Sequence, residues 1–521
     1  MDQLKHVMAV IEARAGELKK PGVVSIRPGY KLRNGWPTKE PAAVVIVSQG
    51  AGPVTLPAEI DGIPVDVRTA TNIEELRFRN PAAFSKLAEQ RAEFRGGAFP
   101  EVDPVAEGAG AAEMTDLGVQ VTAAKPQIPY TPPRGVSLRP VTGIIPITCH
   151  ASPDAGWPVL REYLAGTRST LTVGMYDFTS KHILEEIEKA LLNKRKFDIT
   201  IDNPARNPTA DQTDSQTLAA LSDALGREFR SAWALVQSRK AIRRWIFPSA
   251  YHIKVAVRDS RAVWLSSGNW NNSNQPDMDP INHPAETDQA TARKSDRDWH
   301  MIIEDSGLAR QLEAFLQHDF DVAHTEAGGI QQEAELEAAV PETLRAAAHG
   351  QFQFHRPLRV ASERLTITPL LTPDPGVYQP AMLKLLESAQ NTLYIQLQYI
   401  HPSARQEDAK FTALLETVTA KIQAGLDVRI ILSEAQVSQG WLERLQAAGV
   451  DLSAVRIQHG VHNKGFVVDS KIVVLGSQNW SAEGVLSNRD ASVLVESATV
   501  AEYYQQIFLH DWERLARQRM Q

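Results

Sequence analysis

Two short runs of the sequence place a histidine two residues before a lysine. His252 precedes Lys254 in the first run, and His462 precedes Lys464 in the second. Alternate residues of a strand point to the same face, so the imidazole and the ammonium of each run are expected to lie side by side. The ammonium can neutralise a phosphate oxygen, while the imidazole attacks phosphorus or passes a proton. Each run therefore indicates half of a site for phosphoryl chemistry.

The residues around the two runs match in register. In both copies an aspartate stands seven residues after the histidine and an asparagine seventeen residues after it. The matching pairs are Asp259 and Asp469, Ser267 and Ser477, Asn269 and Asn479, and Trp270 and Trp480. Serine hydroxyls and asparagine amides can bind the equatorial oxygens on which charge spreads during phosphoryl transfer. We therefore expect the paired serines and asparagines to bind substrate and the tryptophans to belong to the core.

A later carboxylate completes each copy. Asp298 and Asp490 both precede an alternating apolar stretch, which ends six residues on at a glutamate. A carboxylate beside a histidine accepts the second ring N–H and so fixes the tautomer. We expect each aspartate to serve the histidine of its own copy, Asp298 that at position 252 and Asp490 that at position 462.

These residues lie in a repeat that begins near residue 150. Strand-like runs at 171–178 and 393–400 each lead into an amphipathic helix with one apolar face, and each helix leads into a further strand, at 197–201 and 428–432. Strand–helix–strand order predicts a sheet with covering helices in each copy. The expected fold class is α/β, with two lobes related by a pseudo-twofold axis, each a mixed sheet flanked by helices.

The N-terminal part of the chain has a different character. An opening helix and three strand-like runs, with an Asn34-Gly35 turn, indicate a small α+β domain to which no role is assigned. A stretch rich in Gly, Ala and Pro follows, which is typical of a linker. The predicted order is residues 1–95 for the small domain, 96–140 for the linker, 141–325 for the first lobe, 326–360 for an inter-lobe connection and 361–521 for the second lobe.

The two motifs resemble the signature of the phospholipase D superfamily, His-x-Lys-x4-Asp followed by Gly/Ser-Ser-x-Asn and present twice. Here they read HIKVAVRD with SSGNW and HNKGFVVD with GSQNW, and the resemblance covers residues 145–515. It implies a phosphodiesterase with one active site between two lobes, which works through a phosphohistidine without a metal or other cofactor. His252 would be the nucleophile and His462 the general acid that later activates water. The resemblance also implies that Asp259 and Asp469 are structural.

The two copies differ from each other at two points. Ser266 stands in the first motif where Gly476 stands in the second. The asparagine and the late aspartate are 29 residues apart in the first copy and 11 in the second. The 18 extra residues lie within the polar run 271–295. We expect this insertion to form a loop beside the site, where it narrows the cleft or touches the substrate.

The resemblance leaves the phosphodiester open, because the superfamily includes nucleases, phospholipases and phosphatidyl transferases. A basic segment at 239–245 precedes His252; it is either a solvated helix face or a grip for a polyanion, with Trp245 stacking on bases. We favour a nuclease acting on nucleic acid over a phospholipase D or phosphatidyl transferase acting on phospholipids. A binding module with a silenced site is the third hypothesis, and it predicts the loss of a motif histidine or lysine.

Composition sets the outer bounds. The net charge is −7, which does not favour a long nucleic-acid footprint. The single cysteine, Cys149, excludes a disulfide framework and a multi-cysteine zinc site. The longest apolar runs, such as 42–47, fall far short of the roughly 20 residues of a membrane span, and the first residues lack the apolar core of a signal peptide. We therefore expect a cytoplasmic protein without an integral membrane segment.

Overall fold

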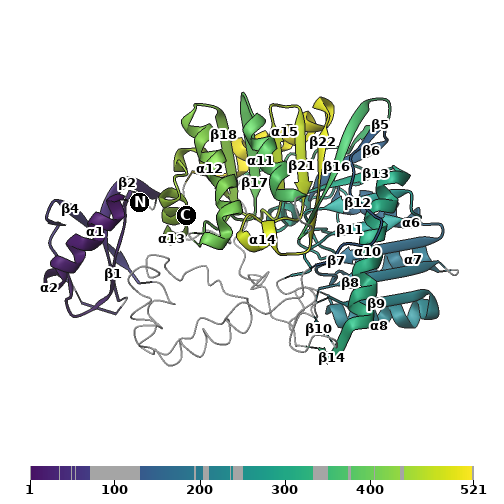
Figure 1. Ribbon diagram of the computed structural model, residues 1–521, viewed down its shortest axis with the longest axis horizontal. Helices are drawn as coiled ribbons and strands as arrows, with labels where there is room; N and C mark the ends of the chain where they lie inside the picture. Colours follow the sequence, from purple (N-terminus) through teal and green to yellow (C-terminus); the bar gives the residue numbers. More distant parts are fainter. Residues whose placement is uncertain are drawn as a thin grey trace. The chain divides into compact units, whose positions relative to one another are not determined.

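The computed structural model describes residues 2–33, 36–48, 50–52, 54–70, 130–192, 195–202, 211–234, 236–238, 250–331, 350–373, 377–403, 405–434 and 439–518 (Figure 1). These residues form two compact units. One contains the described residues up to 70 together with 439–452, and the other contains those of 130–434 and 453–518. The basic segment 239–245, the Asn34-Gly35 turn and most of the predicted linker lie outside the described residues.

The first unit is a four-stranded sheet with a helix on one face. Its elements are α1 (Asp2–Ala13), α2 (Ala15–Leu18), β1 (Val23–Arg33), β2 (Trp36–Val47), β3 (Glu59–Ile60) and β4 (Ile63–Thr69), and the strand order is β1-β2-β4-β3. Val7, Val10 and Ile11 recur at helical spacing and bury against Ala43 and Val45 of β2. This is the small α+β architecture that the N-terminal pattern predicts.

One helix from the C-terminal half of the chain belongs to this unit. Helix α13 (Gln439–Ala447) carries the buried Glu443, which accepts hydrogen bonds from Arg27 at 2.7 Å and from Arg68 at 2.8 Å. The sequence pattern predicts these residues to lie in the second lobe, and the structure differs. A buried carboxylate requires positive partners, and here the two arginines of the N-terminal sheet supply them.

The second unit contains two eight-stranded sheets. The strands of the first are β6 (Ile147–Ser152), β7 (Thr170–Met175), β8 (Lys196–Ile201), β9 (Phe229–Trp233), β11 (Val255–Arg258), β12 (Ala262–Ser266), β13 (Asp298–Ile303) and β15 (Leu358–Val360). Those of the second are β5 (Val141–Ile144), β16 (Arg364–Thr372), β17 (Thr392–Leu397), β18 (Asp427–Ser433), β19 (Val455–Gln458), β20 (Lys464–Val468), β21 (Ile472–Gly476) and β22 (Asp490–Glu496). A short pair, β10 (Val236–Ser238) and β14 (Ala327–Gln331), forms a separate ribbon.

The two sheets have the same topology. Their orders are β15-β6-β13-β12-β11-β7-β8-β9 and β5-β16-β22-β21-β20-β17-β18-β19. In each, three neighbouring strands pair in parallel (β7, β8, β9 and β17, β18, β19) and the others pair antiparallel. The predicted pair of mixed α/β lobes is therefore confirmed.

The edge strands are exchanged between the lobes. Strand β5, at the start of the predicted first lobe, pairs with β16 of the second sheet. Strand β15, in the predicted inter-lobe connection, pairs with β6 of the first sheet. One edge strand of each sheet thus comes from the segment that precedes the other copy.

Helices cover both faces of the sheets (Figure 1). They are α6 (Gly156–Ala165), α7 (Lys181–Leu191), α8 (Asp214–Leu225), α9 (Asp288–Lys294) and α10 (Ser306–Glu326) in the first lobe, and α11 (Tyr378–Ser388), α12 (Ala409–Gln423), α14 (Ala482–Leu486) and α15 (Ala498–His510) in the second. One continuous core contains apolar residues of α10 and α15 and of both sheets, for example Leu312, Val257, Val467 and Ile507. The two lobes therefore share a single core.

Two fully buried arginines hold this interface. Arg297, just before β13, binds Asp511 through Nε at 2.9 Å and Asp154 through Nη1 at 2.7 Å. Arg489, just before β22, binds Asp319 of α10 at 2.7 Å. Each guanidinium thus reaches a carboxylate in the other lobe, and all five side chains are fully buried.

Replacing Arg297 with methionine should lower the free energy of unfolding by about 3–5 kcal/mol, because it leaves two buried carboxylates without their cation. Chemical denaturation followed by tryptophan fluorescence measures this change. Arg359→Met is the matched control, since Arg359 binds Glu304 at 3.3 Å on the surface, and its loss should cost less than about 1 kcal/mol. Equal small losses in both variants would contradict a buried ionic link between the lobes.

Among the described residues, no helix combines the length and apolar character needed to cross a membrane.

Candidate active site

The two histidine–lysine pairs lie at equivalent places, in the segments that lead into β11 and β20. His252 precedes β11, whereas β20 begins at Lys464 itself. The pairs therefore stand at strand entrances rather than within strands. Each lysine folds back onto its own motif: Lys254 Nζ donates to the carbonyl oxygen of His252 at 2.6 Å, and Lys464 Nζ donates to that of His462.

The structure brings the two predicted half-sites together. The ring centroids of His252 and His462 are 6.4 Å apart, and the two side chains belong to different lobes. Both histidines are buried, with 4% and 8% of their surface exposed, and both lysines are buried completely or nearly so. A pair of imidazoles at this separation can address opposite sides of one phosphorus atom.

The aspartates pair with the histidines across the lobes, which corrects the expected arrangement. His252 Nδ1 lies 2.8 Å from Oδ1 of Asp490, and His462 Nδ1 lies 3.0 Å from Oδ1 of Asp298. The sequence analysis assigned each aspartate to the histidine of its own copy, and that assignment is wrong.

Backbone contacts between the lobes explain the crossed pairing. The backbone N–H of His462 donates to the carbonyl oxygen of Arg297 at 3.1 Å, and Arg297 pairs with Val461 as an isolated bridge. The segment that carries Asp298 is therefore fixed alongside the second histidine. In the other half, the N–H of Arg489 donates to the carbonyl oxygen of Ala250, which places Asp490 beside the first histidine.

The motif serines hold the aspartates. Ser267 Oγ donates to Asp298 Oδ1 at 2.7 Å, and Ser477 Oγ donates to Asp490 Oδ1 at 2.6 Å. Each hydroxyl oxygen also accepts a hydrogen bond, at 3.0 Å, from the backbone N–H of the residue that follows the aspartate. These bonds occupy the serine hydroxyls, so the structure places them as supports of the carboxylates rather than as the predicted ligands of phosphate.

The motif asparagines are placed differently. Asn269 and Asn479 lie in the loops after β12 and β21 and are 5% and 4% exposed. The Oδ1 atom of each is buried and has no hydrogen-bond partner among the described residues. A buried polar atom of this kind is costly unless a ligand satisfies it. Their role as substrate ligands remains a prediction that this environment supports.

The free nitrogens of the two histidines are not equivalent. His252 Nε2 is buried without a hydrogen-bond partner among the described residues, and the ring packs edge-on against Tyr176 at 4.9 Å between centroids. His462 Nε2 lies 3.1 Å from Lys464 Nζ, whose ammonium donates to it. With Nδ1–H held by a carboxylate, Nε2 of His252 carries an uncommitted lone pair.

The charges around the first histidine have opposing effects. Burial and the neighbouring Lys254 lower the pKa of His252, against the attraction of Asp490. Burial raises the pKa of Asp490, but the charges of His252 and Lys254 and the hydrogen bonds outweigh it, so the net pKa is lowered. A neutral imidazole beside an ionised carboxylate is the state required of a nucleophile.

The second pair titrates differently. Burial raises the pKa of Asp298 to about 6, in spite of the opposing effect of Lys464 and of the hydrogen bonds that it accepts. Burial and Lys464 lower the pKa of His462 well below its usual value. A bound phosphodiester anion would offset the lysine charge and favour protonation of this imidazole.

The motif aspartates lie at the far ends of their strands. Asp259 accepts hydrogen bonds from the backbone N–H groups of Arg168, Ser169 and Thr170, and Asp469 accepts the equivalent three from residues 390–392. Both adopt a positive φ, 55° and 51°, in the turns that join their hairpins. Their environment is that of structural residues, as the resemblance implies.

The difference between Ser266 in the first motif and Gly476 in the second is matched by a difference in the residue that each one faces. In the first copy, Ser266 Oγ bonds His300 Nδ1 at 2.6 Å. In the second copy, Gly476 occupies the serine position, and a Cβ there would clash with Ser492, the counterpart of the histidine. The exchange of Ser266 for Gly476 therefore matches the residue across the sheet and leaves the active histidines unaffected.

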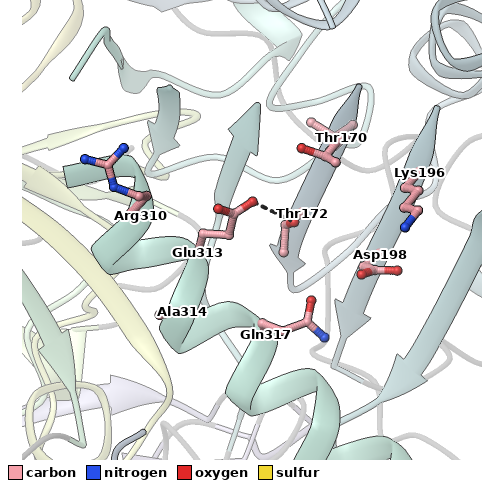
Figure 2. Close-up of a pocket in the computed structure, with 9 residues that line it drawn as sticks. Thr170, Thr172, Lys196, Asp198, Arg310, Glu313, Ala314 and Gln317 are labelled. Carbon is pink, nitrogen blue, oxygen red and sulfur yellow. Dashed lines mark hydrogen bonds between the residues drawn. The ribbon is translucent and has the colours of Figure 1, made fainter. Parts of the chain in front are cut away.

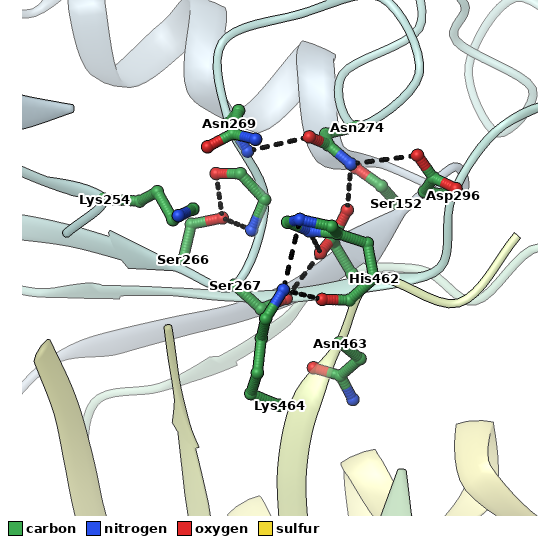
Figure 3. A network of polar contacts seen from close by, with 12 residues as sticks. Ser152, Lys254, Ser266, Ser267, Asn269, Asn274, Asp296, His462, Asn463 and Lys464 are labelled. Atoms are coloured by element: carbon green, nitrogen blue, oxygen red, sulfur yellow. Dashed lines mark hydrogen bonds and ion pairs between the residues drawn. The ribbon is translucent and has the colours of Figure 1, made fainter. Parts of the chain in front are cut away.

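The sequence analysis missed two kinds of residue. Arg297 and Arg489 each stand immediately before a late aspartate, a repeated pair that the register comparison could have found. Asn274 donates to Asp298 Oδ2 at 2.9 Å, and its place in a polar run gave no signal (Figure 3 shows Asn274 with the motif residues around it).

Away from these residues, a groove of about 460 Å³ lies between α10 and strands β7 and β8 (Figure 2). Lys196, Asp198, Arg310 and Glu313 line it together with small polar residues. It contains none of the predicted site residues. No three His, Cys, Asp or Glu side chains within the described ranges are arranged to hold a metal ion.

Part of the chain is similar to known proteins. Residues 382–512 match the family model described as "Cardiolipin synthase, PLD-like domain". A phospholipase D of Rickettsia conorii is 27% identical over 149 residues, which are 28% of this chain and 70% of that protein. A mitochondrial cardiolipin hydrolase of Canis lupus familiaris is 27% identical over 95 residues, 18% of this chain and 36% of that protein. The solved structure of phosphatidylserine synthase from Haemophilus influenzae Rd KW20 has a TM-score of 0.47 and 13% identity and covers 71% of this chain and 87% of its own.

Proposed function

The chain belongs to the phospholipase D superfamily and is a phosphodiesterase, and from this premise we propose that it cleaves phospholipids through a phosphohistidine formed on His252. The observation that carries the mechanism is the crossed pairing of the two histidines with Asp490 and Asp298, at 2.8 and 3.0 Å. It gives each imidazole a fixed Nδ1–H and directs both Nε2 atoms to the shared site.

In the first step, Nε2 of His252 attacks phosphorus and forms a P–N bond while the P–O bond to the leaving alcohol breaks. His462 supplies the proton that the leaving oxygen takes up. In the second step, His462 removes a proton from water, the resulting oxygen attacks phosphorus, and the P–N bond breaks to regenerate His252. Lys254 and Lys464 neutralise the phosphate oxygens throughout.

The roles of the two histidines follow from their free nitrogens. The nucleophile requires an uncommitted lone pair, which His252 Nε2 has among the described residues. The lone pair of His462 Nε2 is by contrast engaged by the ammonium of Lys464, which donates to it from 3.1 Å, so this imidazole is less available to attack phosphorus. We therefore keep the assignment that the resemblance implies, on grounds taken from the site itself.

The substrate class is revised from nucleic acid to phospholipid. The preference for a nuclease was based on the expected cytoplasmic location, on the expected lack of a membrane-binding helix and on the basic segment 239–245, which lies outside the described residues. The named sequence relatives are a phospholipase D and a cardiolipin hydrolase. The net charge of −7 likewise does not favour a polyanionic substrate. Nucleic acid remains the second candidate because of the basic segment.

A substrate panel tests this proposal. The protein is incubated in parallel with vesicles of phosphatidylcholine, vesicles of cardiolipin, single-stranded DNA, duplex DNA and RNA. We expect release of phosphatidic acid or of a free headgroup from at least one lipid, and no cutting of nucleic acid. The silent control is the double variant His252→Asn with His462→Asn. Nucleic-acid cleavage without lipid turnover would overturn the substrate class.

The same panel carries two further arms. With excess EDTA, turnover should be unchanged, because the lysines and histidines of the site perform each step of the scheme; loss of activity that added metal restores would contradict the scheme. With ethanol in the medium, formation of phosphatidylethanol would show that an alcohol competes with water for the phosphoryl-enzyme.

A further inference from the structure

The two half-sites differ in the segment that follows the motif asparagine, and one of the differences reaches the late aspartate. Asn274 stands five residues after Asn269, and Gly484 stands five residues after Asn479. Both segments contain one equivalent hydrogen bond: the N–H of Asn274 donates to the side chain of Asn271 at 2.9 Å, and the N–H of Gly484, in helix α14, donates to that of Ser481 at 3.1 Å. This hydrogen bond is therefore shared, whereas the amide side chain at the fifth position is present in the first copy only.

Asn274 satisfies its whole side-chain amide inside the site (Figure 3). Its Oδ1 accepts the backbone N–H of Asn269 at 3.0 Å. Its two amide N–H groups donate to Asp298 Oδ2 at 2.9 Å and to Asp296 Oδ2 at 3.2 Å. Asn274 is 1% exposed. A buried amide with every group bonded is rigid, so it fixes whatever it contacts.

The second half-site lacks this contact. Glycine at position 484 has no side chain to reach the carboxylate, and Oδ2 of Asp490 is buried without a hydrogen-bond partner among the described residues. A Cβ at this position would clash with the carbonyl oxygen of Asn479, so the turn admits no larger residue there. The late aspartate has both oxygens bonded in the first copy and one in the second.

We propose that Asn274 is a positioning residue that fixes the Asp298 carboxylate, and through it His462, and so makes the two half-sites chemically unequal. The inference rests on the proposed function and deepens it. The hydrogen bond from Asn274 stabilises the ionised Asp298 carboxylate and makes it a weaker base than it would be without that bond. The imidazolium of His462 is therefore a stronger acid with this bond than without it, whereas Oδ2 of Asp490, beside His252, has no such partner among the described residues.

The charges that face Asp298 come from several elements. Lys464 and Lys254 attract it from the two motif segments, His462 contacts it directly, and Asp296 stands on the other side of the shared amide. Burial raises the pKa of Asp298 to about 6, and the hydrogen bond from Asn274 opposes that rise. Without this bond the Asp298–His462 pair should take up its next proton at a higher pH.

Two variants separate the contacts of Asn274. Asn274→Gly copies the residue that the second turn already carries and removes all three hydrogen bonds. Asn274→Asp keeps an acceptor for the N–H of Asn269 but replaces the donor to Asp298 with a second carboxylate. Both are measured on bis(p-nitrophenyl) phosphate across pH, with Asn282→Gly, an exposed asparagine of the same insertion, as the control.

Three results are expected. The kcat of both variants falls about tenfold or more, as for a lost hydrogen bond to a charged group. The acid limb of the kcat profile moves upward by roughly one pH unit in Asn274→Gly and further in Asn274→Asp. KM rises only in Asn274→Gly, because that variant alone releases the backbone of Asn269. Asn282→Gly should match the unmodified protein in all three.

A uniform loss of kcat at every pH, with the acid limb unmoved in both variants, would reduce Asn274 to a structural residue and overturn the inference. The same measurement keeps this failure apart from failure of the proposed function, since the ester contains neither lipid nor nucleotide. Should the unmodified protein leave the ester uncut, the proposed function falls. The inference is then tested by titrating ring-labelled His462. The pKa of His462 should rise in Asn274→Gly and stay unchanged in Asn282→Gly.

Discussion

Replacing His252 with asparagine is expected to lower kcat/KM by about 10⁴-fold or more and to abolish the phosphoryl-enzyme, because the P–N bond has no other nucleophile. Replacing His462 with asparagine should remove turnover by a similar factor but leave the first step intact on an ester of p-nitrophenol. That leaving group departs without a general acid. The His462 variant should therefore release one equivalent of nitrophenol in a burst and then stop.

Rapid mixing with bis(p-nitrophenyl) phosphate measures the burst, and acid-labile phosphate bound to the protein identifies phosphohistidine. His283→Asn is the control, since His283 is an exposed histidine of the insertion. A burst in the His252 variant and none in the His462 variant would reverse the roles. The absence of any burst, with the unmodified protein active, would contradict a covalent intermediate.

The convergence of the two motifs could be predicted from the sequence because the gapless repeat resembles the signature of the phospholipase D superfamily, and that resemblance implies one site between two lobes. His252, Lys254, His462 and Lys464 do meet in one buried site, and the ring centroids of the histidines are 6.4 Å apart. In the structure each motif leads into an equivalent strand of an equivalent sheet.

The partners of the histidines could not be predicted in the same way. Spacing fixes which residues are neighbours within one lobe, but the aspartates act across the interface. The bridge between Arg297 and Val461 sets that contact, and no pattern within either copy indicates it. The role of the motif serines could not be predicted either, because a serine hydroxyl can bind a phosphate or a carboxylate. In the structure Ser267 Oγ donates to the carboxylate of Asp298 at 2.7 Å.

The fold likewise has features that the sequence predicts and features that it does not. The mixed sheets follow from the strand–helix–strand order, which the apolar periodicity reveals. The exchange of β5 and β15 does not, because the register of a short edge strand depends on which sheet has an open edge beside it. Helix α13 joins the N-terminal unit through Glu443, a charge whose partners Arg27 and Arg68 lie some 400 residues earlier.

The crossed pairing of the aspartates with the histidines gives the prediction with the next largest expected loss of activity, after that for the histidine variants. Asp490→Asn and Asp298→Asn should each lower kcat by about 10³- to 10⁴-fold, because an amide does not hold the imidazole tautomer or stabilise the imidazolium as a carboxylate does. The step that fails should differ between them. Asp490 contacts His252, so its replacement should remove the nitrophenol burst. Asp298 contacts His462, so its replacement should keep the burst and stop the hydrolysis of the phosphoryl-enzyme.

Pairing within each lobe predicts the opposite result, a burst in Asp490→Asn and none in Asp298→Asn, so one experiment decides between the two arrangements. The pH profile adds a second criterion. The pKa of Asp298 is raised to about 6 by burial, so the carboxylate is lost as the pH falls through that value and kcat should fall with it. Asp298→Asn should flatten this acid limb, because it removes the carboxylate that titrates there, whereas Asp490→Asn should leave it in place. An unchanged acid limb in Asp298→Asn would show that another group controls the low-pH decline and that His462 draws its support from elsewhere.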